Sequence, residues 1–176
     1  MALKIGSKGV DFHLQGVDGK RYSLSSFEDK KIVVVIISCN HCPTVVAYED
    51  RMMAIQRDYE RKGVALVAIN PNDETRYPMD SFDNMVKRAH EKGFNFPYLR
   101  DETQQVARAY GATRTPEVFA LDGNRRLAFH GRIDDNEHQP GLVKSHDLRR
   151  ALDELLEGKP VSTPETTPVG CTVKWK

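Results

Sequence analysis

Two short, uninterrupted apolar runs constrain the fold of this chain more than any other feature. They are residues 32–37 (IVVVII) and 64–69 (VALVAI), and both are rich in β-branched side chains. Each is far shorter than the roughly 20 residues that a membrane-spanning helix needs. Runs of this length are typical of strands that are buried on both faces of a parallel sheet. Between them, from Pro43 to Lys62, apolar residues recur at helical spacing. The sequence therefore predicts two buried strands joined by a helix.

The rest of the chain continues this alternation of strands and helices. Polar and apolar residues alternate at 10–14 and 21–24 around a turn, which predicts an N-terminal β-hairpin. The remaining predicted elements are helices at 81–92, 103–110 and 147–156, a short strand at 96–99, and a second hairpin of strands at 117–121 and 126–131. The expected fold class is α/β, with a central mixed β-sheet flanked by helices. We expect one domain over residues 1–158 and a C-terminal tail over 159–176 that packs on it.

The composition of the chain narrows its possible partners. The 176 residues include 26 Lys and Arg against 25 Asp and Glu, so the charge pattern gives no indication of nucleic-acid binding. The N-terminus lacks the apolar core of a secretory signal, and we expect a cytoplasmic location with no membrane partner. Three cysteines are too few for a disulfide framework. In a reducing compartment, a close pair of cysteines indicates metal binding or catalysis instead.

Cys39 and Cys42 form such a pair at the point where the predicted structure changes from strand to helix. The strand ends at Ser38 and the helix begins near Pro43, so the thiols lie at a helix N-terminus. Free N–H groups and the helix dipole stabilise a thiolate there, and the thiolate is the nucleophile of disulfide exchange. We predict that Cys39 attacks the substrate and that Cys42 resolves the mixed disulfide. A protonated His41 would make the site more oxidising. A structural zinc site needs four ligands, so we expect no metal.

The cysteine pair and residues 111–122 (GATRTPEVFALD) together resemble a known family. With the predicted order of elements, they resemble the thioredoxin-like superfamily. More narrowly, they resemble its redoxin branch, which holds alkyl hydroperoxide reductase and TlpA-like thiol-disulfide oxidoreductases. The resemblance covers nearly the whole chain and implies a thioredoxin-like fold. It also implies that the Thr115–Pro116 bond is cis, that Pro116 packs against the cysteines, and that the backbone of Thr115 binds an extended substrate segment. Arg114 either stabilises the thiolate or is a solvated loop residue.

Two features depart from a plain thioredoxin, and a third cysteine lies in the tail. The Asn-His dipeptide between the cysteines resembles, in its histidine, the strongly oxidising bacterial disulfide-forming enzymes. Residues 70–78 (NPNDETRYP) form an insertion that we expect beside the site, where it shapes substrate access. Cys171 lies in a tail similar to those of uncharacterised relatives. It is either a third redox thiol that reaches the pair or a small buried residue, and the frequent burial of free cysteine favours the second role.

The leading hypothesis is a thiol-disulfide oxidoreductase that needs no cofactor. Cys39, Cys42 and Pro116 are expected to carry the exchange with a disulfide-containing protein or a small-thiol substrate. An electron donor such as a thioredoxin or glutathione system would then restore the reduced pair. The motif leaves the direction of net electron flow open.

A first alternative keeps the fold and makes the protein a hydroperoxide reductase with antioxidant activity. Cys42-Pro43-Thr44 resembles the Cys-Pro-Thr at the peroxidatic cysteine of peroxiredoxins, so Cys42 would attack the peroxide and Cys39 would be its partner. Against this alternative, Val35 and Cys39 stand where the peroxiredoxin pattern has the proline and threonine that hold the peroxide.

A second alternative, which is not an enzyme, is a thioredoxin-like copper-binding module. Thiolates are soft ligands that select copper(I), and His130 or His138 would serve as a distant ligand. The copper chaperones of this fold space their two cysteines by three residues, however, and this chain spaces them by two.

Overall fold

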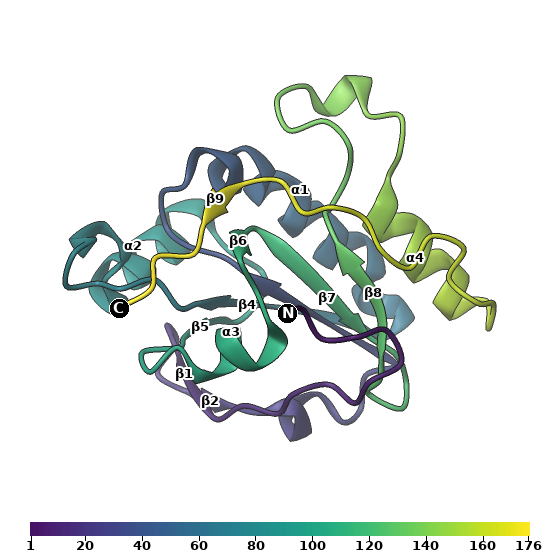
Figure 1. Cartoon of the computed structure of the whole chain (residues 1–176), viewed down its shortest axis with the longest axis horizontal. Helices are drawn as coiled ribbons and strands as arrows, with labels where there is room; N and C mark the ends of the chain where they lie inside the picture. The colour runs from purple at the N-terminus through teal and green to yellow at the C-terminus, as the bar shows by residue number, and fades with distance from the viewer.

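The computed structural model describes residues 1–176 and is built around a seven-stranded mixed sheet (Figure 1). From one edge to the other, the strands are β2 (Arg21–Tyr22), β1 (Leu14–Gly16), β5 (Tyr98–Arg100), β4 (Val64–Asn70), β3 (Ile32–Ile37), β7 (Glu117–Leu121) and β8 (Leu127–Gly131). β4 runs parallel to both β3 and β5, whereas β7 is antiparallel to β3. The predicted mixed sheet is confirmed.

Strand β3 is buried on both faces of the sheet because none of its side chains is polar. Ile32, Val34 and Ile36 enter the hydrophobic cluster on one face of the sheet. The three residues between and after them, Val33, Val35 and Ile37, enter the cluster on the other face. All six side chains are at most 3% exposed, and burying each stabilises the fold by about 1.5–3 kcal/mol. The chain that leaves β3 is therefore fixed in position by the core.

Helices cover both faces of the sheet, as predicted. The face that contains Ile36 is covered by α1 (Pro43–Tyr59), α2 (Phe82–Lys92) and α4 (Asp147–Leu156). The opposite face is covered by α3 (Gln105–Tyr110) and by part of the N-terminal region. Four short 3₁₀ helices complete the structure: η1 (Leu24–Phe27), η2 (Glu60–Lys62), η3 (Pro78–Asp80) and η4 (Pro140–Leu142). None of the helices combines the length and the apolar character needed to cross a bilayer.

The N-terminal hairpin is present, but its first strand begins at Leu14 and not at residue 10. The reason is Asp11, whose carboxylate accepts the backbone N–H groups of Phe12 at 2.8 Å and Leu24 at 2.9 Å. Side-chain bonds of this kind offer the backbone an alternative to a strand ladder. Residues 10–13 therefore run beside the sheet without joining it.

The C-terminal segment, residues 159–176, crosses the molecule after α4 (yellow in Figure 1). It first runs along β8, where the His130 N–H donates to the Pro164 carbonyl at 2.9 Å and the Thr166 N–H donates to the His130 carbonyl at 3.0 Å. It then forms the short strand β9 (Cys171–Thr172), which pairs antiparallel with β6 (Arg114–Thr115). The segment thus ends beside the residues that precede Pro116.

Candidate active site

Cys39 and Cys42 lie where β3 passes into α1, the longest helix. The Ser38 N–H still donates to the Ile69 carbonyl at 2.8 Å, so the ladder with β4 continues to the residue before Cys39. Cys42 is the N-cap residue of α1, and Pro43 is the first helical residue, where a missing N–H costs no intrahelical bond. Both cysteines are buried, with exposed fractions of 3% and 5%. The strand-to-helix position predicted for the pair is the observed one.

Thr115 contacts both members of the pair. The Cys39 sulfur lies 3.6 Å from the Thr115 hydroxyl oxygen, and the Cys42 sulfur lies 3.6 Å from the Thr115 carbonyl oxygen. Thr115 is fully buried, and its bond to Pro116 is cis, as the family resemblance implied. The backbone of Thr115 thus forms one wall of the site.

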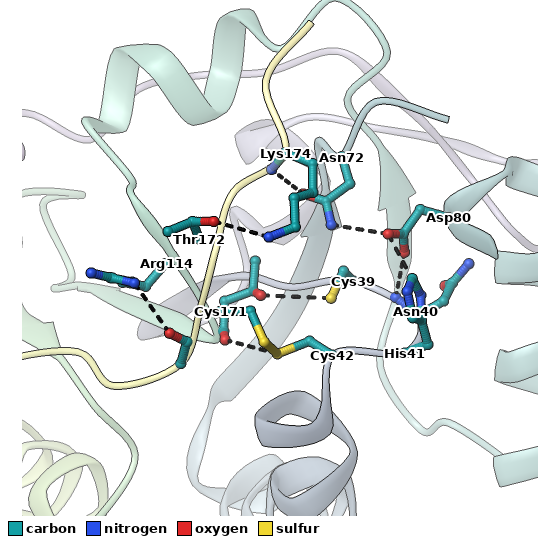
Figure 2. The surroundings of a disulfide bond; sticks show 12 residues. Cys39, Asn40, His41, Cys42, Asn72, Asp80, Arg114, Cys171, Thr172 and Lys174 are labelled. Carbon is teal, nitrogen blue, oxygen red and sulfur yellow. Dashed lines mark hydrogen bonds and ion pairs between the residues drawn. A yellow bond between two sulfur atoms is a disulfide. The ribbon is translucent and has the colours of Figure 1, made fainter. Parts of the chain in front are cut away.

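The disulfide in the structure joins Cys42 to Cys171, not to Cys39 (Figure 2). The two bonded residues are 129 positions apart in the sequence, and their Cα atoms are 6.2 Å apart. Cys39 is the free cysteine. The expectation that Cys171 is simply a small buried residue is therefore wrong, because Cys171 is half-buried and bonded to the motif.

The pKa of the Cys39 thiol is raised to about 11, mainly by burial and in addition by the negative charge of Asp80. The Thr115 hydroxyl and the backbone N–H groups of Cys42 and His41 act in the opposite direction. The expected stabilisation of the thiolate by this turn is thus present, but desolvation outweighs it. With the C-terminal segment in place, Cys39 is a protonated thiol at neutral pH.

Asp80 is the functional residue that sequence reasoning missed. Its fully buried carboxylate accepts the Asn40 backbone N–H at 2.8 Å and the Asn72 side-chain amide at 3.0 Å. The Nδ1 atom of His41 lies 3.7 Å from the same carboxylate. The His41 ring therefore lies beside the Asp80 carboxylate. The insertion at 70–78 was expected beside the site, but no local pattern marks Asp80, which lies just beyond it.

Arg114 does not face the thiols. Its side chain is exposed and donates to the Gly170 carbonyl at 3.4 Å, so it contacts the C-terminal segment (Figure 2). The charged group that contacts the backbone before Thr115 is Glu117. Its carboxylate accepts the backbone N–H groups of Thr113 and Arg114 at 2.9 and 3.0 Å. Glu117 also lies 2.6 Å from His130. Glu117 is the only charged residue in the strand EVFAL, and this isolated charge was the one feature of the sequence that indicated a buried Glu117–His130 pair.

The two histidines considered as distant copper ligands have other neighbours. His130 is buried against Glu117, and His138 has a highly exposed side chain beside Glu137. No group of three or more His, Cys, Asp or Glu side chains is arranged to hold a metal ion.

The sheet order, the cis proline edge and the strand-to-helix cysteine pair define a thioredoxin-like protein, and solved structures that match most of the chain have this fold. The family model described as Redoxin matches residues 4–152. Because this match covers more than half of the sequence, the chain belongs to the Redoxin family. The resemblance drawn from the cysteine pair and the Thr-Pro motif is confirmed.

Similar proteins extend this assignment. The thiol-disulfide oxidoreductase ResA of Geobacillus thermodenitrificans is 27% identical over 156 residues, which cover 88% of this chain and 79% of ResA. The crystal structure of an uncharacterized conserved protein from Geobacillus kaustophilus is 40% identical, with a TM-score of 0.93 over 98% of this chain and 93% of that one. A hypothetical protein from Sinorhizobium meliloti 1021 is 37% identical, with a TM-score of 0.92 over 100% and 97% of the two chains. Family and relatives identify an oxidoreductase of the thiol-disulfide class.

Proposed function

We propose that the protein exchanges disulfides through Cys39 and Cys42, with Cys39 as the nucleophile and Cys42 as the resolving thiol. The observation that carries this proposal is the contact of both sulfur atoms with Thr115, at 3.6 Å each, beside the cis Pro116. An extended substrate that pairs with the Thr115 backbone brings its disulfide next to both sulfurs.

The exchange proceeds by two displacements at sulfur. The Cys39 thiolate attacks one substrate sulfur, and the other substrate sulfur leaves as a thiolate and takes up a proton. Cys42 then attacks the Cys39 sulfur of the mixed disulfide, which releases the second substrate thiol and forms a Cys39–Cys42 disulfide. The substrate gains two electrons and the protein loses two. The Thr115 hydroxyl and the N–H groups of this turn lower the pKa of Cys39. Cys171 of the C-terminal segment packs against the two cysteines, so a substrate that displaces this segment reduces the burial that raises the pKa of Cys39.

The proposed substrate is a disulfide-containing protein or a small-thiol disulfide. The proposed electron donor is a dithiol of the thioredoxin or glutathione type. The similarity to the ResA oxidoreductases supports disulfide substrates as a class.

The test is the reduction of glutathione disulfide that carries self-quenching eosin labels, with dithiothreitol as the electron source. We expect Cys39→Ser and Cys42→Ser each to abolish turnover above the dithiothreitol background. Val46→Ser is the control, because Val46 lies in the first turn of α1 and is 42% exposed. Full activity in Cys39→Ser would refute the proposal.

A second function, hydroperoxide reduction at Cys42, is favoured by one observation, the disulfide between Cys42 and Cys171. A peroxide would oxidise the Cys42 thiol to a sulfenic acid, with release of an alcohol or water. The Cys171 thiol would then displace water from the sulfenic sulfur and form the observed bond. This second function gives Cys171, and not Cys39, the role of partner.

Consumption of hydrogen peroxide by the fully reduced protein tests this second function, with a free thiol of matched pKa as the reference. Consumption far above the reference that is lost in Cys42→Ser would favour the peroxide reaction over disulfide exchange. Consumption near the reference would exclude it.

A further inference from the structure

The C-terminal segment occupies the edge that an extended substrate would use. In the β6–β9 pair, Cys171 lies opposite Thr115 and Thr172 lies opposite Arg114. β6 has no other partner strand. Cys171 thus pairs with Thr115 at the position proposed for the substrate, and its sulfur is bonded to Cys42 (Figure 2).

Contacts on both sides of Cys171 hold the segment in place in addition to the disulfide. On its N-terminal side, Gly170 lies so close to Thr115 that an added Cβ atom would collide with the Thr115 carbonyl group. On its C-terminal side, the Val173 N–H donates to the Thr113 carbonyl at 3.0 Å, and the Lys174 N–H donates to the Asn72 side chain at 2.9 Å. None of these contacts involves the sulfur atom, so we expect Cys171 to stay beside Cys42 in the reduced protein.

We propose that Cys171 is a third redox residue, which takes over the disulfide formed between Cys39 and Cys42 and presents it to the electron donor. The inference rests on the proposed function, because it supplies the step that follows substrate release. It assigns the Cys42–Cys171 bond to the resting oxidised state of the enzyme.

The transfer is a disulfide isomerisation and needs no external oxidant. The Cys171 thiol loses a proton, and its thiolate attacks the Cys42 sulfur of the Cys39–Cys42 disulfide. The Cys42–Cys171 bond forms, the Cys39–Cys42 bond breaks, and Cys39 leaves as a thiolate that takes up the proton. The protein contains one disulfide and one thiol before and after the step.

The released Cys39 thiolate takes up a proton, because the pKa of Cys39 is raised to about 11 when the segment is in place. The exposure of the three sulfurs then decides which of them the electron donor reaches. Cys171 is half-buried, whereas Cys39 and Cys42 are only 3% and 5% exposed. An external dithiol therefore reaches Cys171 more easily than the other two sulfurs. When it attacks the Cys171 sulfur, Cys42 leaves as a thiolate at the N-terminus of α1, where the helix dipole stabilises it.

Reduction is completed by the second thiol of the donor. Its thiolate attacks the donor sulfur that is bonded to Cys171, which closes the donor disulfide and releases the Cys171 thiolate. The donor loses two electrons and the protein returns to three thiols. β9 is then free of a covalent bond again, so substrate and segment compete for Thr115 in the reduced enzyme.

Peptide mapping tests the relay, because trypsin separates the two possible disulfides. Cys39 and Cys42 share the peptide 32–51, whereas Cys171 lies in the peptide 151–174, since the Lys159-Pro160 bond resists cleavage. Reduced protein is mixed with excess glutathione disulfide, quenched with acid at intervals, alkylated and digested. We expect peptide 32–51 with an internal disulfide at early times and the linked pair of peptides later. Cys171→Ser should stop at the first product.

The outcomes separate the inference from the proposed function. Exchange that depends on Cys39 while the linked peptides never form would overturn the relay and leave the proposed function intact. Exchange that is absent from wild-type protein would refute the proposed function, and the relay with it. Linked peptides that persist in Cys42→Ser would also overturn the relay, because they would join Cys171 to Cys39.

Gly170→Ala tests the position of the segment without altering a thiol. The added methyl group displaces β9 from Thr115, so we expect formation of the linked peptides to slow about tenfold, with the early product unchanged. Val169→Ala is the matched control, since Val169 is the preceding residue and is 55% exposed. Equal rates in the two variants would show that β9 does not deliver Cys171.

Discussion

Cys42 and Cys171 share one disulfide, but different parts of the fold hold them. Cys42 follows β3, whose side chains are at most 3% exposed, and its helix is anchored by buried residues such as Met52. Cys171 lies in a two-residue strand that backbone hydrogen bonds attach to β6 and to neighbouring loops. The Cys42 side of the disulfide is therefore the fixed half, held by the core, and the Cys171 side is the half that can be released. Any movement linked to the redox state therefore belongs to the C-terminal segment.

The largest effect is expected on the fixed half. Ile36→Ala removes a fully buried side chain just before the site, and such changes cost about 2–5 kcal/mol of unfolding free energy because they leave a cavity. Urea unfolding measured by circular dichroism checks this value, with Val169→Ala in the C-terminal segment as the control, expected within about 0.5 kcal/mol of wild type. A loss below about 1 kcal/mol in Ile36→Ala would mean that the core does not fix Cys42.

The second prediction concerns Cys39, which also belongs to the fixed half. Its pKa is about 11 in the folded, oxidised protein, against an ordinary value of 9.0. Below pH 9 the thiol is protonated in both states, whereas between these values only the unfolded chain ionises, so stability falls as the pH rises. One pKa unit is worth about 1.4 kcal/mol, and we expect a loss of about 1.5–2 kcal/mol between pH 8.5 and 10.5 that is absent from Cys39→Ser. Urea titrations at pH 8.5 and 10.5 measure it, and parallel losses in both proteins would contradict it.

Asp80 couples the two halves, because Asn72 binds Asp80 through its amide and the Lys174 N–H through its oxygen. The Asp80 charge raises the pKa of Cys39, so Asp80→Asn should lower that pKa by about one unit. Alkylation of Cys39 by iodoacetamide in the oxidised protein should then be about tenfold faster at pH 8. Asp83→Asn is the matched control, since Asp83 is exposed three residues later. An equal acceleration in the control would mean that general charge, and not the buried carboxylate, governs Cys39.

The parts of this structure that local patterns encode could be predicted from the sequence. Six consecutive apolar residues can only be buried on both faces, and the change of period after Ser38 located the cysteine pair at a helix N-terminus. The cis Thr115–Pro116 bond was available only through family resemblance, since a Thr-Pro dipeptide alone is compatible with an ordinary loop.

The parts that depend on long-range contacts could not be predicted. No local pattern connects Cys42 to a residue 129 positions later, and frequent burial of free cysteine indicated the wrong role for Cys171. The protonation of Cys39 was also missed, because the helix N-terminus is visible in the sequence but the burial that outweighs it is not. That burial and the Asp80 charge both arise from tertiary packing.

The smallest expected effect tests release of the C-terminal segment itself. Reduction of the Cys42–Cys171 bond leaves the backbone hydrogen bonds of the segment in place, so opening becomes more frequent by only about three- to fivefold. The exposed Glu165 makes this measurable, because a glutamyl endopeptidase cuts there when the segment opens. We expect reduced wild type to be cut about three- to fivefold faster than oxidised wild type, and Cys171→Ser to match the reduced rate in either condition. Equal rates for oxidised and reduced protein would mean that the hydrogen bonds alone hold the segment, and that both halves of the site are fixed.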